Sequence, residues 1–185
     1  MRLRAAEEAS LYSLEFRVSI DGYSPETNDP IRGNGTFARA MSGIQKLVQH
    51  GFLPIITAAQ VWPDERNRQV VEKFVQVLKA AGYARPRLKI LPTLKIGAEE
   101  TRTSGYALTE RVSREMLAGY DSSQLVCEHS RCVTDRGVHV CPILIEAPDS
   151  LMGQSLADSL QPYAIRHGAC YTCYQHGAIC SNPSS

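Results

Sequence analysis

Short apolar runs alternate with amphipathic stretches over the first part of the chain. Residues 14–20, 52–58 and 87–91 are rich in β-branched and other apolar side chains, which predicts three strands. Between them, residues 36–48 and 70–82 repeat apolar positions at a spacing of about three to four, which predicts two helices. Strands apolar on both faces, alternating with helices, favour a parallel sheet covered by helices.

The number of strands limits the fold. A closed TIM-type barrel requires eight strands and about 250 residues, and this pattern contains three strands. We therefore expect an α/β fold built on an incomplete TIM-type βα barrel with parallel strands. The open edge of such a sheet leaves backbone groups unpaired, so an upstream segment or a partner should cover it. Residues 2–14 look like the end of a preceding helix, which favours a missing upstream part and indicates a fragment.

The composition changes at Cys127. All six cysteines lie between residues 127 and 180. The stretch CVTDRGVHVC, residues 132–141, predicts a β-hairpin, and residues 155–168 predict a helix that leads to the last cysteines. A small cysteine-rich C-terminal extension with a hairpin and a helix should therefore follow the sheet. The expected parts are 1–105 for the sheet domain, 106–126 for a connecting segment and 127–185 for the cysteine-rich domain.

Composition and charge narrow the classes of function. The 185 residues are 43% hydrophobic and 21% charged, which suits a folded domain rather than a disordered tail. Twenty Lys and Arg residues balance nineteen Asp and Glu residues, so no basic field predicts nucleic acid as a partner. The longest apolar run, 52–62, is too short to cross a bilayer, so no membrane is expected. The first residues lack the pattern of a signal peptide, and we expect a cytoplasmic protein.

Six cysteines in a reducing compartment indicate metal ligation or redox chemistry rather than disulfides. Scattered buried thiols would explain Cys127 alone, not six cysteines in one segment. A C-x2-C pair and two cysteines at the feet of a hairpin could supply four thiolates, which suit zinc or an iron–sulfur cluster equally well. Four histidines lie among the cysteines and could substitute for them: His129, His139, His167 and His176.

Two stretches resemble the radical S-adenosylmethionine (SAM) superfamily. Residues 16–51, FRVSIDGYSPETNDPIRGNGTFARAMSGIQKLVQHG, resemble the fourth strand, loop and helix of its catalytic domain. The later order of a cysteine, a hairpin with glycine, a second cysteine, a helix and C-x2-C is similar to the SPASM or twitch extension of that superfamily. The resemblance covers roughly residues 14–180. It implies that the sheet domain is the C-terminal part of the radical SAM partial barrel, and that 127–185 is an auxiliary cluster domain.

The resemblance also implies ligands for a metal cofactor. It assigns an auxiliary [4Fe–4S] cluster to four cysteines, with two further cysteines as alternative or additional ligands. A full SPASM extension has more cysteines after its C-x2-C pair, which counts against a second auxiliary cluster here. The four are Cys132, Cys141, Cys170 and Cys173, and the further two are Cys127 and Cys180.

The catalytic part of the resemblance is incomplete. The sequence lacks the C-x3-C-x2-C motif that binds the SAM-cleaving cluster in this superfamily, so the chain alone should not generate a radical. The resemblance implies that Ser19 hydrogen-bonds SAM and that Arg32 pairs with its carboxylate, since guanidinium binds carboxylate in a bidentate manner. Otherwise Arg32 would be a surface residue and Ser19 a satisfied core hydroxyl. Asp21, before Gly22, is more typical of a turn than of a catalytic acid, and no catalytic residue is assigned.

The leading interpretation is the C-terminal portion of a radical SAM enzyme. Such an enzyme would modify a peptide or small metabolite, with SAM and a [4Fe–4S] cluster as cofactors and a ferredoxin or flavodoxin as reductant. The alternative is a zinc-stabilised interaction module without catalysis. A small ferredoxin-like electron carrier is a third hypothesis, which the large sheet domain disfavours.

Overall fold

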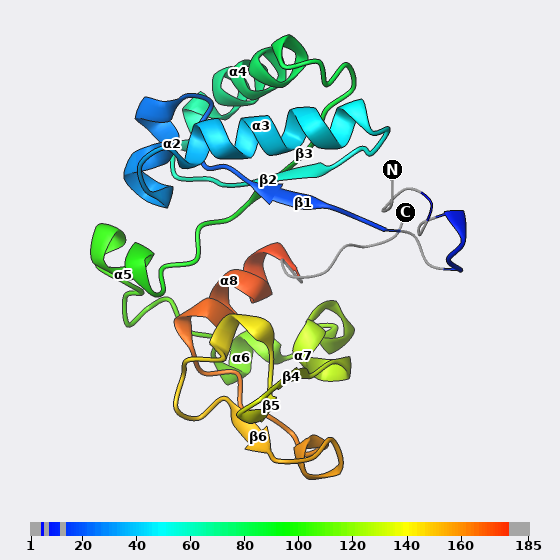
Figure 1. Cartoon of the computed structure of the whole chain (residues 1–185). Helices are drawn as coiled ribbons and strands as arrows, with labels where there is room; N and C mark the ends of the chain where they lie inside the picture. Colours follow the sequence, from blue (N-terminus) through cyan, green and yellow to red (C-terminus); the bar gives the residue numbers. More distant parts are fainter. Residues whose placement is uncertain (1–4, 6–7, 12–13, 178–185) are drawn as a thin grey trace. The chain divides into compact units, whose positions relative to one another are not determined.

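The computed structural model describes residues 5, 8–11 and 14–177 (Figure 1). The chain forms two compact units, Met1–Thr93 and Leu94–Ser185. The second unit begins before residue 106, and so it includes the stretch 106–126 that the sequence indicates as a connecting segment. Much of the expected upstream helix at residues 2–14 lies outside the described residues.

The first unit contains a parallel sheet of three strands in the order β1-β2-β3. Ile56, in the central strand, stands opposite Val18 on one side and Leu88 on the other. The strands follow the three apolar runs, although each is shorter than its run. They are β1 (Arg17–Ser19), β2 (Ile55–Ala59) and β3 (Arg87–Leu91).

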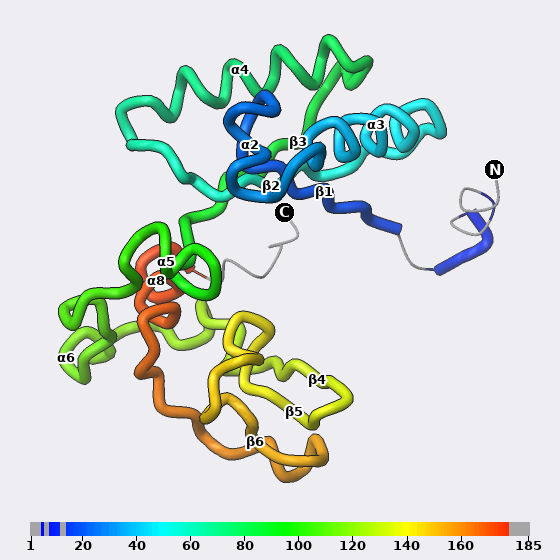
Figure 2. Tube along the Cα trace, turned by 60° about the vertical axis from the view of Figure 1, so that its left-hand side comes forward, coloured from blue at the N-terminus to red at the C-terminus, as the bar shows by residue number. Residues whose placement is uncertain are grey.

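Two amphipathic helices, α3 (Thr36–Gln49) and α4 (Asn67–Ala80), lie side by side on one face of this sheet (Figures 1 and 2). A 3-10 turn, η1 (Asp64–Arg66), leads into α4. A further helix, α2 (Pro25–Arg32), forms within residues 23–35, a polar stretch whose two prolines and two glycines predict a loop. Ser24 begins α2 with a capping box, and Pro25 follows at a position where a helix tolerates proline.

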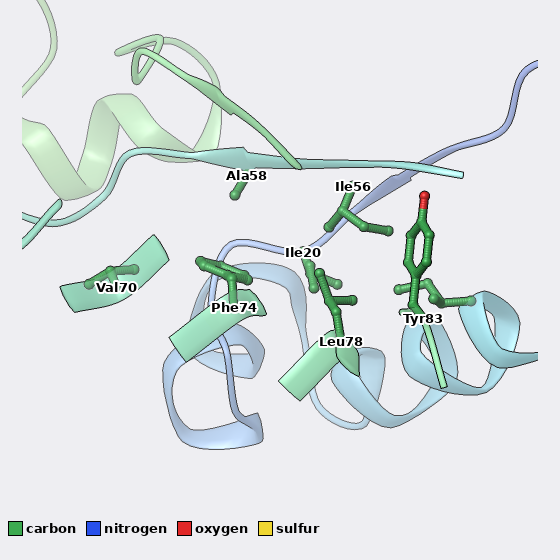
Figure 3. Packing of buried hydrophobic residues seen from close by; sticks show 8 residues of the cluster. Ile20, Ile56, Ala58, Val70, Phe74, Leu78 and Tyr83 are labelled. Atoms are coloured by element: carbon green, nitrogen blue, oxygen red, sulfur yellow. The ribbon is translucent and has the colours of Figure 1, made fainter. Parts of the chain in front are cut away.

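The core of the first unit lies between the sheet and the helices α3 and α4, with Ile44 of α3 buried in it, and Figure 3 shows its α4 side. Ile56 and Ala58 of β2 face the α4 side chains Val70, Phe74 and Leu78. The buried ring of Tyr83 closes one end of this core, and its hydroxyl donates a hydrogen bond to the Pro54 carbonyl over 2.7 Å. Apolar burial against both helices is therefore what holds the short strands together.

The expected incomplete TIM-type barrel is wrong. The parallel sheet has three strands and stays open, and the strands after β3 pair in a separate antiparallel sheet. The apolar runs predicted the βαβαβ order correctly, but they carry no information on curvature. Closure needs a consistent strand number and tilt, and after Pro92 the chain forms no further parallel strand among the described residues.

The second unit contains a small antiparallel sheet in the order β4-β5-β6. The predicted hairpin is confirmed, because β4 and β5 pair with Cys132 opposite His139 and Val133 opposite Val138. The pattern did not predict the third strand. The strands are β4 (Cys132–Thr134), β5 (Gly137–His139) and β6 (Leu151–Gly153).

Short helices surround this sheet. The helix expected over residues 155–168 is wrong, because that stretch contains only a 3-10 turn before Pro162, which cannot donate a backbone hydrogen bond. A regular helix begins later and carries both cysteines of the C-x2-C pair. The helices are α5 (Ala98–Thr103), α6 (Arg114–Leu117), α7 (Val126–His129) and α8 (Gly168–His176), and the 3-10 turns are η2 (Ser122–Gln124), η3 (Pro142–Leu144) and η4 (Ala157–Ser159).

None of the helices in the described part of the chain combines the length and the apolar character that a bilayer crossing requires.

Candidate metal centre

A cavity of about 30 Å³ lies in the second unit and is lined by four cysteine side chains. The remaining wall is almost entirely apolar and includes Val140, Leu144 and Ala169 from the core of this unit. Three separate segments supply the sulfur atoms. The four cysteines are Cys127, Cys141, Cys170 and Cys173.

Helix α8 brings two of these thiols to the cavity. Cys170 and Cys173 are three residues apart on α8, a spacing that places both side chains on neighbouring positions of one helix surface. Gly168 at the start of α8 packs directly against the ring of Tyr106, where a Cβ atom would come within 2.1 Å of a ring carbon. Tyr106 also shares a 2.7 Å hydrogen bond with the hydroxyl of Thr172. The close approach at Gly168 thus sets the position of the helix and its cysteines.

The segment before α8 is fixed by charged groups. Asp149 accepts hydrogen bonds from Arg166 Nε and shares one with His167 Nε2, each over 2.8 Å. Burial raises the pKa of Asp149, but the hydrogen bonds and charges of His167 and Arg166 outweigh it and leave the pKa below its usual value. The Asp149 carboxylate therefore ties the loop before β6 to the start of α8.

The other two thiols come from α7 and from the end of the hairpin. Arg131 donates hydrogen bonds from Nη1 to the Cys127 carbonyl over 2.6 Å and from Nε to the Ser159 carbonyl over 2.9 Å. Cys141 lies two residues beyond β5 and directly before the turn η3. Its neighbour Val140 donates a backbone hydrogen bond to Ser150. The Arg131 side chain thus holds the backbone at Cys127, and a backbone hydrogen bond holds the segment at Cys141.

The electrostatics of the cavity favour neutral thiols when no metal is bound. Burial raises the pKa of Cys170 to about 11, and nearby Cys127 and Cys141 add to the effect. Burial also raises the pKa of Cys127, with Cys141 as the next cause that raises it. As thiolates, these three cysteines of one cavity would repel one another. A positively charged metal centre would offset that repulsion and deprotonate the thiols.

The structure brings together three of the four cysteines that the family resemblance assigned as ligands, and it adds Cys127. Cys132 does not line the cavity. The reason is the register of the hairpin, which pairs Cys132 with His139 rather than with Cys141. Cys132 and Cys141 are therefore offset by two residues in the register of the hairpin, and only Cys141 lines the cavity. Cys180 lies outside the described residues.

The histidines near the cysteines do not line the cavity. His139 is buried and its Nδ1 shares a 2.9 Å hydrogen bond with Ser150 Oγ, whereas His167 is engaged by Asp149. His129 and His176 are exposed. In the described part of the chain, no group of three or more His, Cys, Asp or Glu residues is arranged to hold a single metal ion.

Tyr163 lines the cavity together with the cysteines. Its hydroxyl oxygen is buried and has no hydrogen-bond partner among the described residues. Burial raises the pKa of Tyr163 to about 12, and Asp149, Cys170 and Cys141 contribute to the increase. The sequence offered no signal for this residue beyond a single aromatic residue after Pro162.

The first unit holds the residues that the resemblance assigned to SAM. Ser19, at the end of β1, shares a 2.8 Å hydrogen bond with the hydroxyl of Thr57 in β2. Arg32 donates from Nε to Asp21 Oδ2 over 2.7 Å. Asp21 also accepts a 2.7 Å hydrogen bond from the backbone nitrogen of Ala59. These residues gather at the carboxyl ends of β1 and β2, where open parallel sheets bind ligands.

Comparison with models of protein families, with curated proteins and with solved structures found no match for this chain.

Proposed function

We propose that the second unit binds one [4Fe–4S] cluster through Cys127, Cys141, Cys170 and Cys173, and that the chain is the C-terminal portion of a radical SAM enzyme. The observation that carries this proposal is the cavity lined by four cysteines from three segments. Four thiolates are the usual ligand set of such a cluster. The buried Tyr163 hydroxyl without a partner also fits a cavity whose occupant supplies a hydrogen-bond acceptor.

A zinc-stabilised interaction module is the second candidate, because four thiolates also suit a tetrahedral zinc ion. Among the described residues no group of His, Cys, Asp or Glu is arranged around a single ion, although four cysteines line one cavity. The preference for a cluster rests on the resemblance to the radical SAM superfamily, and metal analysis of the purified chain decides between the two.

The bound cluster would transfer electrons or bind the substrate, which in this proposal is a peptide or small metabolite. The protein residues would position the cluster and exclude water, because the cavity wall is largely apolar. Ser19 and Arg32 are proposed to contact SAM at the carboxyl ends of the parallel strands, with Asp21 holding the Arg32 guanidinium. A ferredoxin or flavodoxin is the proposed reductant. The cytosol is the proposed compartment, since it keeps thiols such as Cys127 and Cys170 reduced.

Anaerobic reconstitution with iron and sulfide tests the ligand set. The wild-type chain should become brown and contain about four iron and four sulfide per chain. Cys127→Ala and Cys170→Ala should each lose most of the iron. Cys132→Ala is the matched control and should retain the wild-type iron content, because Cys132 lies outside the cavity.

Two results would contradict the proposal. A colourless chain that holds one zinc per molecule would support the interaction module instead. Loss of the cluster in Cys132→Ala with retention in Cys127→Ala would restore the ligand set that the resemblance assigned and overturn the one proposed from the cavity.

A further inference from the structure

The hydroxyl group of Tyr163 lies in an environment that offers it no hydrogen bond among the described residues. The phenolic oxygen is buried and lacks a hydrogen-bond partner among the described residues. The residue lines the same cavity as Cys141, Cys170 and the other two cysteines. A buried hydroxyl without a partner is costly, so its presence calls for an explanation.

Water would satisfy this hydroxyl poorly. A buried water molecule needs two to four polar partners, roughly three on average. The wall of the cavity is apolar apart from the thiols and Tyr163, so it offers such a molecule few strong hydrogen bonds. An electron-rich sulfur inside the cavity would be a better acceptor. A tyrosine hydroxyl is protonated at neutral pH, so Tyr163 can donate a hydrogen bond.

We propose that Tyr163 donates a hydrogen bond to a sulfur atom of the bound cluster or of its thiolate ligands, and that this bond raises the reduction potential of the cluster. The inference rests on the proposed function. Reduction adds negative charge to the cluster, and a hydrogen bond to sulfur stabilises the more negative state. Tyr163 acts here as a residue that tunes the cluster and not as one of its ligands.

Tyr163→Phe tests this role because it removes only the hydroxyl. The reconstituted variant should contain the same iron and sulfide as the wild type, and its reduction potential should be more negative. Loss of one hydrogen bond to a charged acceptor changes an equilibrium by about tenfold or more. Only the difference in the strength of this bond between the reduced and the oxidised cluster changes the potential, so we expect a negative shift of up to about 59 mV for a one-electron couple. Redox titration followed by electron paramagnetic resonance of the reduced cluster measures it.

Tyr171→Phe is the matched control. Tyr171 lies on α8 next to Cys170, but it does not line the cavity, and its hydroxyl accepts a hydrogen bond from Gln175 at the exposed side. This variant should keep the wild-type potential. In the metal-free chain, Tyr163→Phe should be at least as stable as the wild type, since the hydroxyl has no hydrogen-bond partner in the part of the chain that the structure describes. A merely structural role would produce a loss of stability and no change in potential.

The outcomes separate the two proposals. A wild-type chain that binds no iron–sulfur cluster overturns the proposed function and this inference with it. A wild-type chain that binds the cluster, together with a Tyr163→Phe variant of unchanged potential, overturns only the role of Tyr163. A similar shift in Tyr163→Phe and Tyr171→Phe would also overturn that role, because it would show an effect that is not specific to the cavity.

Discussion

Asp21 and Arg32 form an ion pair in which Arg32 Nε lies 2.7 Å from Asp21 Oδ2. The Asp21 side chain is 5% exposed, whereas that of Arg32 is 37% exposed. The second carboxylate oxygen accepts a hydrogen bond from the Ala59 backbone nitrogen. One buried carboxylate therefore joins the end of α2 to the ends of two parallel strands. This is a structural role for Asp21, in addition to its position before the turn at Gly22.

Asp21→Ala should lower the free energy of unfolding of the first unit by about 1–3 kcal/mol, because it leaves the Ala59 nitrogen without its acceptor. Arg32→Ala should cost no more than about 1 kcal/mol, since Arg32 is partly solvated. Trp62, the single tryptophan, packs against Phe74 with ring centroids 5.9 Å apart. Its fluorescence during urea unfolding reports on this unit. Equal losses of unfolding free energy in Asp21→Ala and Arg32→Ala would contradict the prediction that Asp21 contributes more than Arg32.

Gly168→Ala should destabilise the second unit by about 1–3 kcal/mol, because the added methyl group overlaps the Tyr106 ring and forces α8 to move. Hydrogen exchange of the α8 amides should accelerate, and Cys170 should react faster with a thiol reagent, as mass spectrometry can show. Gly43→Ala makes the same chemical change within α3, where no atom lies within 4 Å of the new methyl group. This control should gain up to about 1 kcal/mol. Unchanged protection of α8 in Gly168→Ala would refute the prediction.

The lowered pKa of Asp149 makes a contribution to stability that depends on pH. The ionised form is favoured in the folded chain, so this contribution is present above the ordinary pKa of 3.8 and is lost as pH falls through the lowered value. Asp149→Asn should therefore cost no more than about 1 kcal/mol at neutral pH, because Asp149 is about one third exposed. The difference from the wild type should vanish in acid. Denaturant unfolding across this pH range measures both effects, and a difference that grows in acid would contradict the sign.

The apolar pattern was sufficient to predict the packing of the first unit. Ile44 and Phe74 recur at helical spacing and are buried as expected, and the strands follow the apolar runs. The partial barrel did not follow from any residue pattern in this way, because curvature depends on further parallel strands, and the described residues form only three. The sequence also indicated a polar loop where Pro25 begins a helix, since its polar composition hid the capping box at Ser24.

The candidate site was harder to predict for a geometric reason. The number of cysteines identified the cysteine-rich segment as the candidate site, but the sequence provided no reason to distinguish Cys132 from Cys141 at the two ends of the hairpin. A two-residue turn pairs Thr134 with Gly137, and this register leaves Cys141 two residues beyond the partner of Cys132. Tyr163 could not be singled out, because its importance depends on an oxygen atom that only the three-dimensional packing leaves unsatisfied.

The order in which the four thiols occur along the chain matters during biosynthesis. Cys127 and Cys141 leave the ribosome before α8, which is the last of the described elements and carries Cys170 and Cys173. Because a domain generally folds as a unit, the cavity cannot form until α8 has been translated. Nascent chains therefore pass through a stage in which two of the four thiols are present without the helix that carries the other two.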